Sequence, residues 1–230
     1  MNDIKALTFD LDNTLWETDF SILNAEAIMR QHLEELAPAA WMADFSLEAF
    51  RAVRADVVAE HPDMAHNLSM VRRSTLTRWF RDQGASSMEA EELAGEGFRV
   101  FYHARQQVEP YPMAVETIEA LAGRFPIGAI TNGNADLLAM PIGRHFQFSY
   151  KAEDFPAPKP HPVMFEAALE ALGIAAHQCL HVGDDVEHDI DGALAAGMRT
   201  AWVNTRGLPT ESGRHADLIL SDVSELLKHL

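Results

Sequence analysis

The pattern of apolar and polar positions differs between two parts of the chain: one has short apolar runs, and the other has long segments of helical periodicity. The first run, Ile4 to Phe9, is continuously apolar apart from single polar positions and ends in polar residues, which is typical of a buried strand in an α/β sheet. From about Thr18 to Val108, apolar positions recur at helical spacing in long segments with little strand character. This second pattern predicts a bundle of about four helices.

Strand-like and helical segments alternate beyond Pro110 and Pro112, which break the helical pattern. The strand-like runs are PIGAITN, FSYKAE, CLHVGDD, TAWVN and DLIL, at residues 126–132, 148–153, 179–185, 200–204 and 217–220. Helical segments are expected up to about residue 123 and at 136–140, 162–172, 186–196 and 221–230. The alternation predicts an α/β fold with a doubly wound, Rossmann-like parallel sheet, into which the helical block is inserted after the first strand.

Composition fits one large globular domain or two small ones, with 230 residues, of which 47% are hydrophobic and 23% charged. The 18 Lys and Arg against 35 Asp and Glu give a formal charge of −17, which argues against nucleic acid as a partner. The single Cys179 excludes an intramolecular disulfide. Since neither a leader pattern nor a membrane-length apolar run is evident, we expect a cytoplasmic protein with no membrane partner.

Carboxylates follow the first strand, at the edge where open parallel sheets bind their ligands. Asp10 and Asp12 are two residues apart, so in an extended chain both side chains would lie on one face. Two carboxylates held that close repel each other unless a cation lies nearby or one of them carries a proton. Both situations are typical of catalytic sites.

Other chemically useful side chains follow the later strands. Thr131 and Asn132 end one strand, and another is followed by Asp184, Asp185 and Asp189, while Lys159 lies in the Pro-rich segment PAPKPHP. Each residue alone could be a turn, a helix cap or a solvated side chain. An acidic pair, a hydroxyl, an amine and a second acidic cluster at one edge of one sheet together favour a catalytic site.

Four segments carry a resemblance to a known family. They are FDLDNTL at 9–15, ITNG at 130–133, KP at 159–160 and GDDVEHD at 183–189. In sequence and order they resemble the four motifs of the haloacid dehalogenase (HAD) superfamily of phosphohydrolases. The resemblance implies a catalytic core of residues 1–16 and 109–230 and a helical cap domain of the first type at 17–108. The segments FDLDNTLWE, ITNGNAD and LHVGDD look like the bacterial branch that includes flavin mononucleotide and ribitylaminouracil phosphate phosphatases.

Phosphoryl transfer assigns a role to each candidate residue. Asp10 is the candidate nucleophile, forming an aspartyl-phosphate, and Asp12 is the candidate general acid for the leaving alcohol and then the base for water. Thr131 would donate a hydrogen bond to a transferring oxygen, helped by backbone N–H groups around Asn132 and Gly133. Lys159 would neutralise charge on both Asp10 and the phosphoryl group.

The expected cofactor is Mg²⁺. Asp10 and Asp184 would converge from neighbouring strands and offer the hard oxygen ligands that this ion prefers. The family resemblance adds the backbone carbonyl of Asp12 as a third contact. Asp185 and Asp189 are placed farther out, as ligands through water or as side chains that orient the ligands.

The sequence therefore predicts a Mg²⁺-dependent phosphatase for a small soluble phosphomonoester, such as a sugar phosphate or a flavin mononucleotide-like molecule. A phosphomutase of the same superfamily would retain all four motifs, and a non-catalytic phosphate-ligand-binding protein is the alternative from another class. A receiver domain would lack the helical insertion, and a dehalogenase would need neither Asp12 as a proton shuttle nor Asp184 as a metal ligand. The motifs specify neither the physiological substrate nor the oligomeric state.

Several conspicuous residues are expected to serve the structure alone. His181 is interpreted as a satisfied core residue and Cys179 as a small buried hydrophobe. The basic group at 72, 73, 78 and 81 is expected to be a solvated helix face. Trp16, Phe20 and Trp79 are weak candidates for contacts with a substrate ring, with core packing the preferred role of each.

Overall fold

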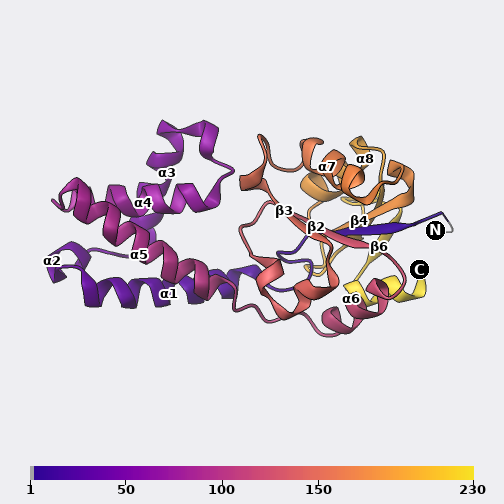
Figure 1. The fold of residues 1–230 in the computed structure, drawn as a ribbon, viewed down its shortest axis with the longest axis horizontal. Coiled ribbons are helices and arrows are strands. Elements are labelled where there is room, and N and C mark those ends of the chain that lie inside the picture. Colours follow the sequence, from indigo (N-terminus) through magenta and orange to yellow (C-terminus); the bar gives the residue numbers. More distant parts are fainter. Residues whose placement is uncertain (1–2) are drawn as a thin grey trace. The chain divides into compact units, whose positions relative to one another are not determined.

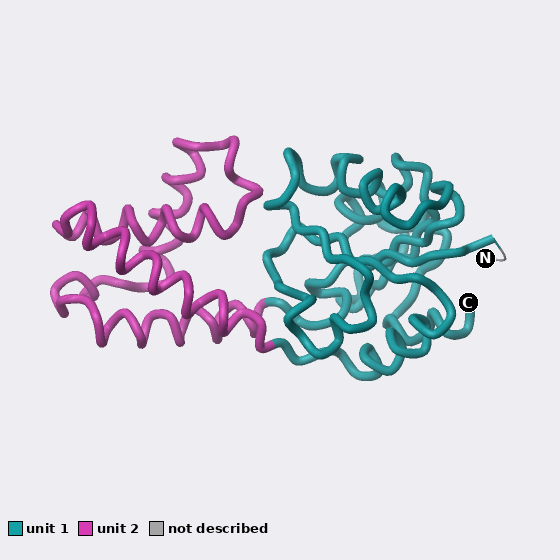
Figure 2. Tube along the Cα trace, viewed as in Figure 1, with its two compact units in different colours: residues 1–18, 108–230 teal, residues 19–107 magenta. Residues whose placement is uncertain are grey.

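The computed structural model describes residues 3–230 and divides the chain into two compact units (Figure 2). Unit 1 consists of the residues up to Thr18 together with Val108–Leu230. Unit 2 consists of Asp19–Gln107 and holds the long helices that follow the first strand. Each unit has a hydrophobic core of its own.

Unit 1 is built on a six-stranded parallel sheet with the order β3-β2-β1-β4-β5-β6 (Figure 1). The strands are β1 (Ala6–Phe9), β2 (Ile127–Thr131), β3 (Phe148–Lys151), β4 (Cys179–Gly183), β5 (Arg199–Val203) and β6 (Leu218–Leu220). The prediction of a doubly wound parallel sheet is confirmed. Because the chain moves outward from β1 first in one direction and then in the other, the order reverses beside β1, where ligands bind in folds of this type.

Successive residues of the central strands pack into different cores on the two faces of the sheet. Leu7 and Phe9 of β1 belong to the core that also contains α6 (Ala114–Ala122), whereas Ala6 belongs to the core that contains α7 (Val163–Leu172) and α8 (Gly192–Ala195). Figure 1 shows α6 on one face of the sheet and α7 and α8 on the other. Burial on both faces explains why these strands are short, continuous apolar runs.

The segment predicted as one helix over 186–196 consists of a π-helical part followed by an α-helical part. Val186–Asp191 forms a π-helical turn, and α8 begins only at Gly192. Asp185 caps the turn by accepting a hydrogen bond from the backbone N–H of His188, at 2.8 Å. The wide turn also lets the carboxylate of Asp189 reach back to the N–H of Asp185, at 3.0 Å. Such π-helical turns are frequent at functional sites.

Two further helical segments of unit 1 are shorter and tighter than predicted. The segment near 136–140 is a single 3₁₀ turn, Leu137–Ala139, and the last helix is a 3₁₀ segment, Val223–Lys228. The side chain of Asp222 caps this last segment by accepting from the N–H of Ser224, at 2.8 Å.

Unit 2 contains α1 (Thr18–Leu36), α2 (Ala39–Met42), α3 (Leu47–Glu60), α4 (Leu68–Asp82) and α5 (Ser87–Arg105). Four of these are long, as predicted, and α2 is one additional turn. The start of α5 is a capping box, in which Ser86 and Glu89 each bond to the other's backbone N–H. The core of this unit includes Leu33, Phe80 and Phe101.

The expectation that Arg72 lies on a solvated helix face is wrong. Its guanidinium pairs with Glu26 at 3.0 Å and lies 3.5 Å from the centre of the Phe101 ring, and both charged side chains are largely buried. An arginine can be buried in this way because its planar group stacks on an aromatic face while its edge stays paired. Arg73 and Arg81 are exposed, as expected.

Within residues 3–230, we find no helix with both the length and the apolar character needed to cross a membrane.

Candidate active site

The predicted site residues come together in unit 1, beyond the carboxyl ends of β1, β2 and β4. A cavity of about 210 Å³ opens there. All nine residues predicted from the sequence line it: Asp10, Asp12, Thr131, Asn132, Gly133, Lys159, Asp184, Asp185 and Asp189. Asn13, His188 and Arg206 complete the lining among the described residues.

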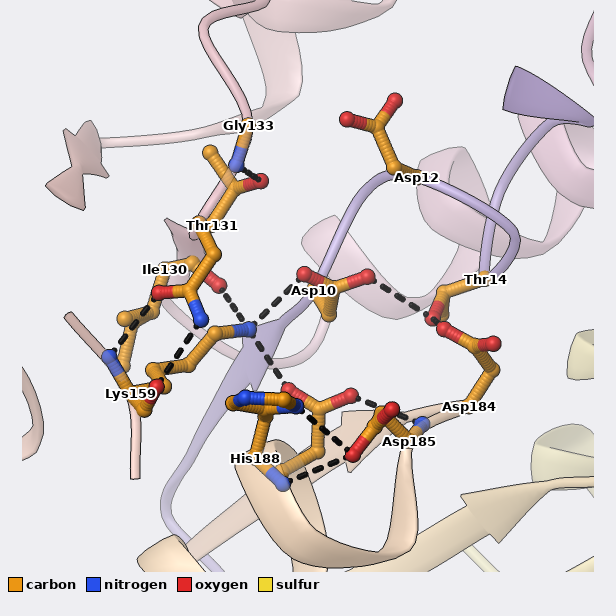
Figure 3. A network of polar contacts seen from close by, with 12 residues as sticks. Asp10, Asp12, Thr14, Ile130, Thr131, Gly133, Lys159, Asp184, Asp185 and His188 are labelled. Carbon is orange, nitrogen blue, oxygen red and sulfur yellow. Dashed lines mark hydrogen bonds and ion pairs between the residues drawn. The ribbon is translucent and has the colours of Figure 1, made fainter. Parts of the chain in front are cut away.

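Lys159 is the central cation of the site (Figure 3). Its ammonium donates to Asp10 at 2.8 Å, to Asp189 at 2.6 Å and to the carbonyl of Ile130 at 2.7 Å. Only 1% of the residue is exposed. Burial by itself would lower the pKa of Lys159, but the attraction of Asp10 and Asp189 outweighs it and raises the pKa, so the ammonium stays charged.

Asn132 positions Lys159 by pairing with its backbone. The side-chain amide of Asn132 donates to the Lys159 carbonyl at 2.9 Å, and its oxygen accepts from the Lys159 N–H at 2.8 Å. This two-point contact joins the loop after β2 to the segment that carries the lysine. The side-chain amide of Asn132 is therefore engaged in holding Lys159, whereas the ligand contact predicted at this residue is made by the backbone N–H.

Asp189 connects the lysine to a buried histidine. His181 of β4 contacts Asp189 through Nε2 at 3.2 Å and Thr8 through Nδ1 at 2.9 Å. Burial lowers the pKa of His181, so the ring is neutral. Because Lys159 and His181 more than offset the effect of burial, the pKa of Asp189 is lowered and its ionised carboxylate accepts the Nε2 proton. His181 is buried, as expected, and it also orients the acid that holds Lys159.

A glycine provides the space that Asp189 occupies. A Cβ at Gly183 would lie 2.3 Å from the Asp189 carboxyl group, closer than any real contact. The glycine in the sequence GDD is therefore required by the close packing of the π-helical turn against the end of β4.

Asp10 lies at the end of β1 and is 6% exposed. One of its oxygens accepts from Lys159, and the other accepts from the hydroxyl of Thr14 at 3.1 Å. Burial raises the pKa of Asp10 well above its ordinary value, the carboxylates of Asp189 and Asp184 raise it further, and Lys159 offsets these effects in part. Ionisation of Asp10 is thus favoured by any further positive charge brought to the site.

Asp12 is held apart from Asp10, facing the loop after β2 (Figure 3). The indole N–H of Trp16 donates to Asp12 Oδ1 at 2.9 Å. The other oxygen packs against Gly133, where an added Cβ would lie only 2.2 Å away. Trp16 is fully buried and positions this acid, so it does not offer its ring to a substrate.

Thr131 is the last residue of β2 and is fully buried. Its hydroxyl oxygen accepts from the N–H of Gly133 at 2.9 Å. Since a hydroxyl can accept and donate at once, its own proton is left to donate to a ligand in the cavity. The Gly133 N–H, in contrast, is already engaged with Thr131.

Asp184 follows β4 and carries the third carboxylate of a close cluster. Its backbone carbonyl accepts from the indole N–H of Trp202 at 2.8 Å, and its carboxylate accepts from Arg206 at 2.6 Å and from Thr14 at 3.4 Å. Burial, reinforced by Asp189, raises the pKa of Asp184 to about 6, although Arg206 opposes the shift. Asp185 is more exposed and contacts His188 at 2.9 Å.

The cluster fits a divalent cation such as Mg²⁺. Oxygens of Asp10, Asp184 and Asp189 lie within 4.8 Å of one another. Burial, the largest cause, raises the pKa values of Asp10 and Asp184 although each contacts one cationic side chain, so a further positive charge would favour their ionised forms. Both oxygens of Asp189 accept from N–H donors, Oδ1 from Lys159 and Oδ2 from the backbone of Asp185, whereas Asp10 Oδ2 and Asp184 Oδ1 share a single donor, the hydroxyl of Thr14. Asp10 and Asp184 are therefore the carboxylates best able to bind the ion.

Sequence reasoning missed the supporting residues Thr14, His181, Trp202 and Arg206. Arg206 could have been found by the rule used for the others, because it lies in the polar segment directly after β5. No sequence pattern identified His181 or Trp202 as supporting residues, because tertiary packing determines their partners.

Comparison with known proteins shows the family to which the chain belongs. Residues 4–197 match the family model described as "haloacid dehalogenase-like hydrolase". The chain therefore belongs to the haloacid dehalogenase-like hydrolases, as its four motifs predicted.

Individual relatives span almost the whole chain. It is 32% identical over 227 residues to "5-amino-6-(5-phospho-D-ribitylamino)uracil phosphatase YigB" of Escherichia coli, covering 99% of this chain and 91% of that protein. The chain is also 29% identical over 206 residues to "Glyceraldehyde 3-phosphate phosphatase" of Methanopyrus kandleri, a match that covers 87% of this chain and 84% of that protein. A solved structure of a protein named 2-haloacid dehalogenase, from Pseudomonas syringae, superposes with a TM-score of 0.91 at 40% identity, covering 98% and 97%.

Proposed function

We propose that the protein is a Mg²⁺-dependent phosphatase that hydrolyses a small phosphomonoester through an aspartyl-phosphate on Asp10. The observation that carries this proposal is the arrangement around Asp10: a buried carboxylate in contact with a buried ammonium, beside a second acid that faces the same cavity. Relatives named as phosphatases of small phosphorylated molecules support it. A sugar phosphate or a flavin mononucleotide-like phosphate is the substrate class that we propose.

In the first half-reaction, an oxygen of Asp10 attacks phosphorus and the bond to the leaving alcohol breaks. Lys159 holds Asp10 in position and offsets the negative charge that builds up as a carboxylate approaches a phosphate. The hydroxyl of Thr131 donates to an oxygen of the transferring group. Asp12 gives its proton to the leaving oxygen.

In the second half-reaction, Asp12 takes a proton from water, which attacks phosphorus and restores the Asp10 carboxylate. The contact with Trp16 holds Asp12 at the cavity, where it can exchange a proton with the leaving oxygen and then with water. One acid thus serves both steps, in opposite protonation states.

The metal ion would be held by Asp10 and Asp184, with Asp189 oriented nearby by Lys159 and His181. When bound, Mg²⁺ neutralises negative charge shared by the carboxylates and the phosphate. The backbone carbonyl of Asp12 remains the third proposed contact, on the family resemblance.

The experiment is phosphate release from a panel of phosphomonoesters, with Mg²⁺ and with EDTA. The panel includes a flavin phosphate, sugar phosphates and an aryl phosphate, and chloride release from a 2-haloacid tests the activity for which the similar Pseudomonas protein is named. We expect Mg²⁺-dependent phosphate release and no chloride release. Metal-independent chloride release without phosphatase activity would refute the proposal. Transfer of the phosphoryl group back to the substrate, with no free phosphate, would identify a phosphomutase.

A further inference from the structure

All three N–H donors of the Lys159 ammonium are used within the protein. An ammonium has three N–H donors, and Lys159 already has three acceptors at 2.6 to 2.8 Å, namely Asp10, Asp189 and the Ile130 carbonyl. The lysine supplies positive charge to the site but has no remaining donor for an anionic ligand. A phosphoryl group that enters the cavity therefore needs another cationic donor.

Arg206 is the other side chain in the cavity lining that is always cationic, among the residues the structure describes. It lies on the segment after β5, which two hydrogen bonds hold in a turn. The side-chain amide of Asn204 donates to the carbonyl of Leu208 and its oxygen accepts from the N–H of Leu208, both at 2.8 Å. The neighbouring Thr205 hydroxyl donates to the carbonyl of Asn13, at 3.4 Å. This anchoring keeps the base of Arg206 beside the loop that carries Asp12.

The guanidinium of Arg206 forms an ion pair with Asp184, one of the two carboxylates proposed to bind the metal ion. It donates to Asp184 at 2.6 Å, and while the Asp184 side chain is only 7% exposed, that of Arg206 is 56% exposed. An ion pair with one partner this exposed is weak, and a cation attracted by Asp10, Asp184 and Asp189 competes with it for the same carboxylate. The two positive groups also repel each other.

We propose that Arg206 is an anion-binding residue for the phosphoryl group, held on Asp184 in the metal-free protein and released when a divalent cation binds that carboxylate. The released side chain has the planar pair of donors that binds phosphate oxygens in two places. It stays anchored at the cavity by its own segment. Metal binding therefore prepares the site for the anion. The inference rests on the proposed function, since that function supplies the metal and the phosphoryl group.

The test uses titration calorimetry on the full chain with two probes, Mg²⁺ alone and then inorganic phosphate at saturating Mg²⁺. Arg206→Gln is compared with Arg199→Gln, which removes an arginine of nearly equal exposure, 55%, from an ion pair with Asp217. Arg206→Lys keeps the charge but removes the planar fork. None of these exposed changes disturbs the core.

We expect Arg206→Gln to bind Mg²⁺ about threefold more tightly, the scale of one exposed ion pair. We expect it to bind phosphate about tenfold or more weakly, the scale of a hydrogen bond to a charged group. Arg206→Lys should bind phosphate with intermediate affinity, and Arg199→Gln should match the wild type in both titrations. Unchanged or weaker Mg²⁺ binding by Arg206→Gln, or unchanged phosphate binding, would overturn the inference.

The same titrations separate this inference from the proposed function. A wild-type protein that binds no Mg²⁺ would overturn both. A wild-type protein that binds both probes but hydrolyses no phosphomonoester would refute the phosphatase, while the two affinities of Arg206→Gln would still decide the role of Arg206.

Discussion

Asp10 and Asp12 lie in one loop but have different surroundings and different proposed roles. Their substitution by asparagine should therefore affect catalysis differently. Asp10→Asn removes the proposed nucleophile, so phosphate release from an aryl phosphate should fall at least about 10³-fold. Asp12→Asn keeps the nucleophile but loses proton transfer, so both half-reactions should slow, by about 10²- to 10⁴-fold. Asp44→Asn makes the same chemical change at an exposed position of unit 2 and should have wild-type kinetics. Near-native turnover by Asp10→Asn would contradict the assignment of the nucleophile.

The raised pKa of Asp184 predicts how metal binding depends on pH. Burial raises this pKa to about 6 in the metal-free protein, so below that pH the carboxyl group is protonated. Because Mg²⁺ binds the ionised form, it must then displace a proton, and its affinity should fall as the pH drops through about 6. Calorimetric titration with Mg²⁺ on both sides of that pH measures this. An affinity that does not change across this range would show that Asp184 is not a ligand.

At the scale of single residues, the sequence identified the groups with reactive chemistry but not those that orient them. Asp10, Asp12 and Asp184 were predictable because carboxylates directly follow buried strands. The role of His181 was not, because an apolar strand accepts a buried histidine for many reasons, and its link to Lys159 runs through Asp189 on a π-helical turn. Only the folded chain brings these three side chains together.

The loop after β2 packs against Asp12 on the side opposite its contact with Trp16, and Gly133 is the residue of the loop that touches it. A Cβ there would lie 2.2 Å from Asp12 Oδ2, and since that oxygen is the end of a side chain, Asp12 should move while the backbone stays. We expect Gly133→Ala to lower kcat by about 10²-fold, the cost of displacing a catalytic group by about 1 Å, with little change in Tm.

Gly95→Ala is the matched control for that variant. Gly95 lies inside α5, and its added Cβ would have no atom within 4 Å. It should leave kcat unchanged and raise stability by about 0.5–1 kcal/mol, because alanine favours a helix interior over glycine. Thermal melts and steady-state kinetics on both variants decide the matter. Wild-type kcat in Gly133→Ala would show that the contact with Asp12 is not critical.

At the scale of elements, strands were easier to predict than the ends and types of short helices. All six strands were recognised, and the four central ones are continuous apolar runs because both faces of the sheet bury them, whereas the edge strands β3 and β6 are more exposed. The segment 186–196 has helical periodicity throughout, yet six residues cannot distinguish a π-helical turn from an α-helix by pattern. The wide turn forms where Asp189 packs against Gly183, a contact outside any local pattern.

At the scale of the whole molecule, unit 2 has its own core, and we propose that it acts as the cap that selects the substrate. Replacing residues 20–107 by a short flexible linker should then reduce the preference for a small phosphomonoester over a phosphopeptide. The measurement is the ratio of kcat/KM for the two substrates, in a variant whose circular dichroism shows a folded α/β domain. An unchanged ratio in that folded variant would refute selection by unit 2.

The most direct test of the central claim is chemical detection of the phosphorylated residue. Asp12→Asn is mixed with an aryl phosphate and Mg²⁺, stopped with acid, and digested for mass spectrometry. Loss of the general base should slow hydrolysis of the intermediate more than its formation, because an aryl oxide leaves with little help from a general acid. We predict one phosphoryl group, on Asp10, that is removed by hydroxylamine and absent when EDTA replaces Mg²⁺. A phosphoryl group on any other residue, or none while the wild type releases phosphate, would contradict the mechanism.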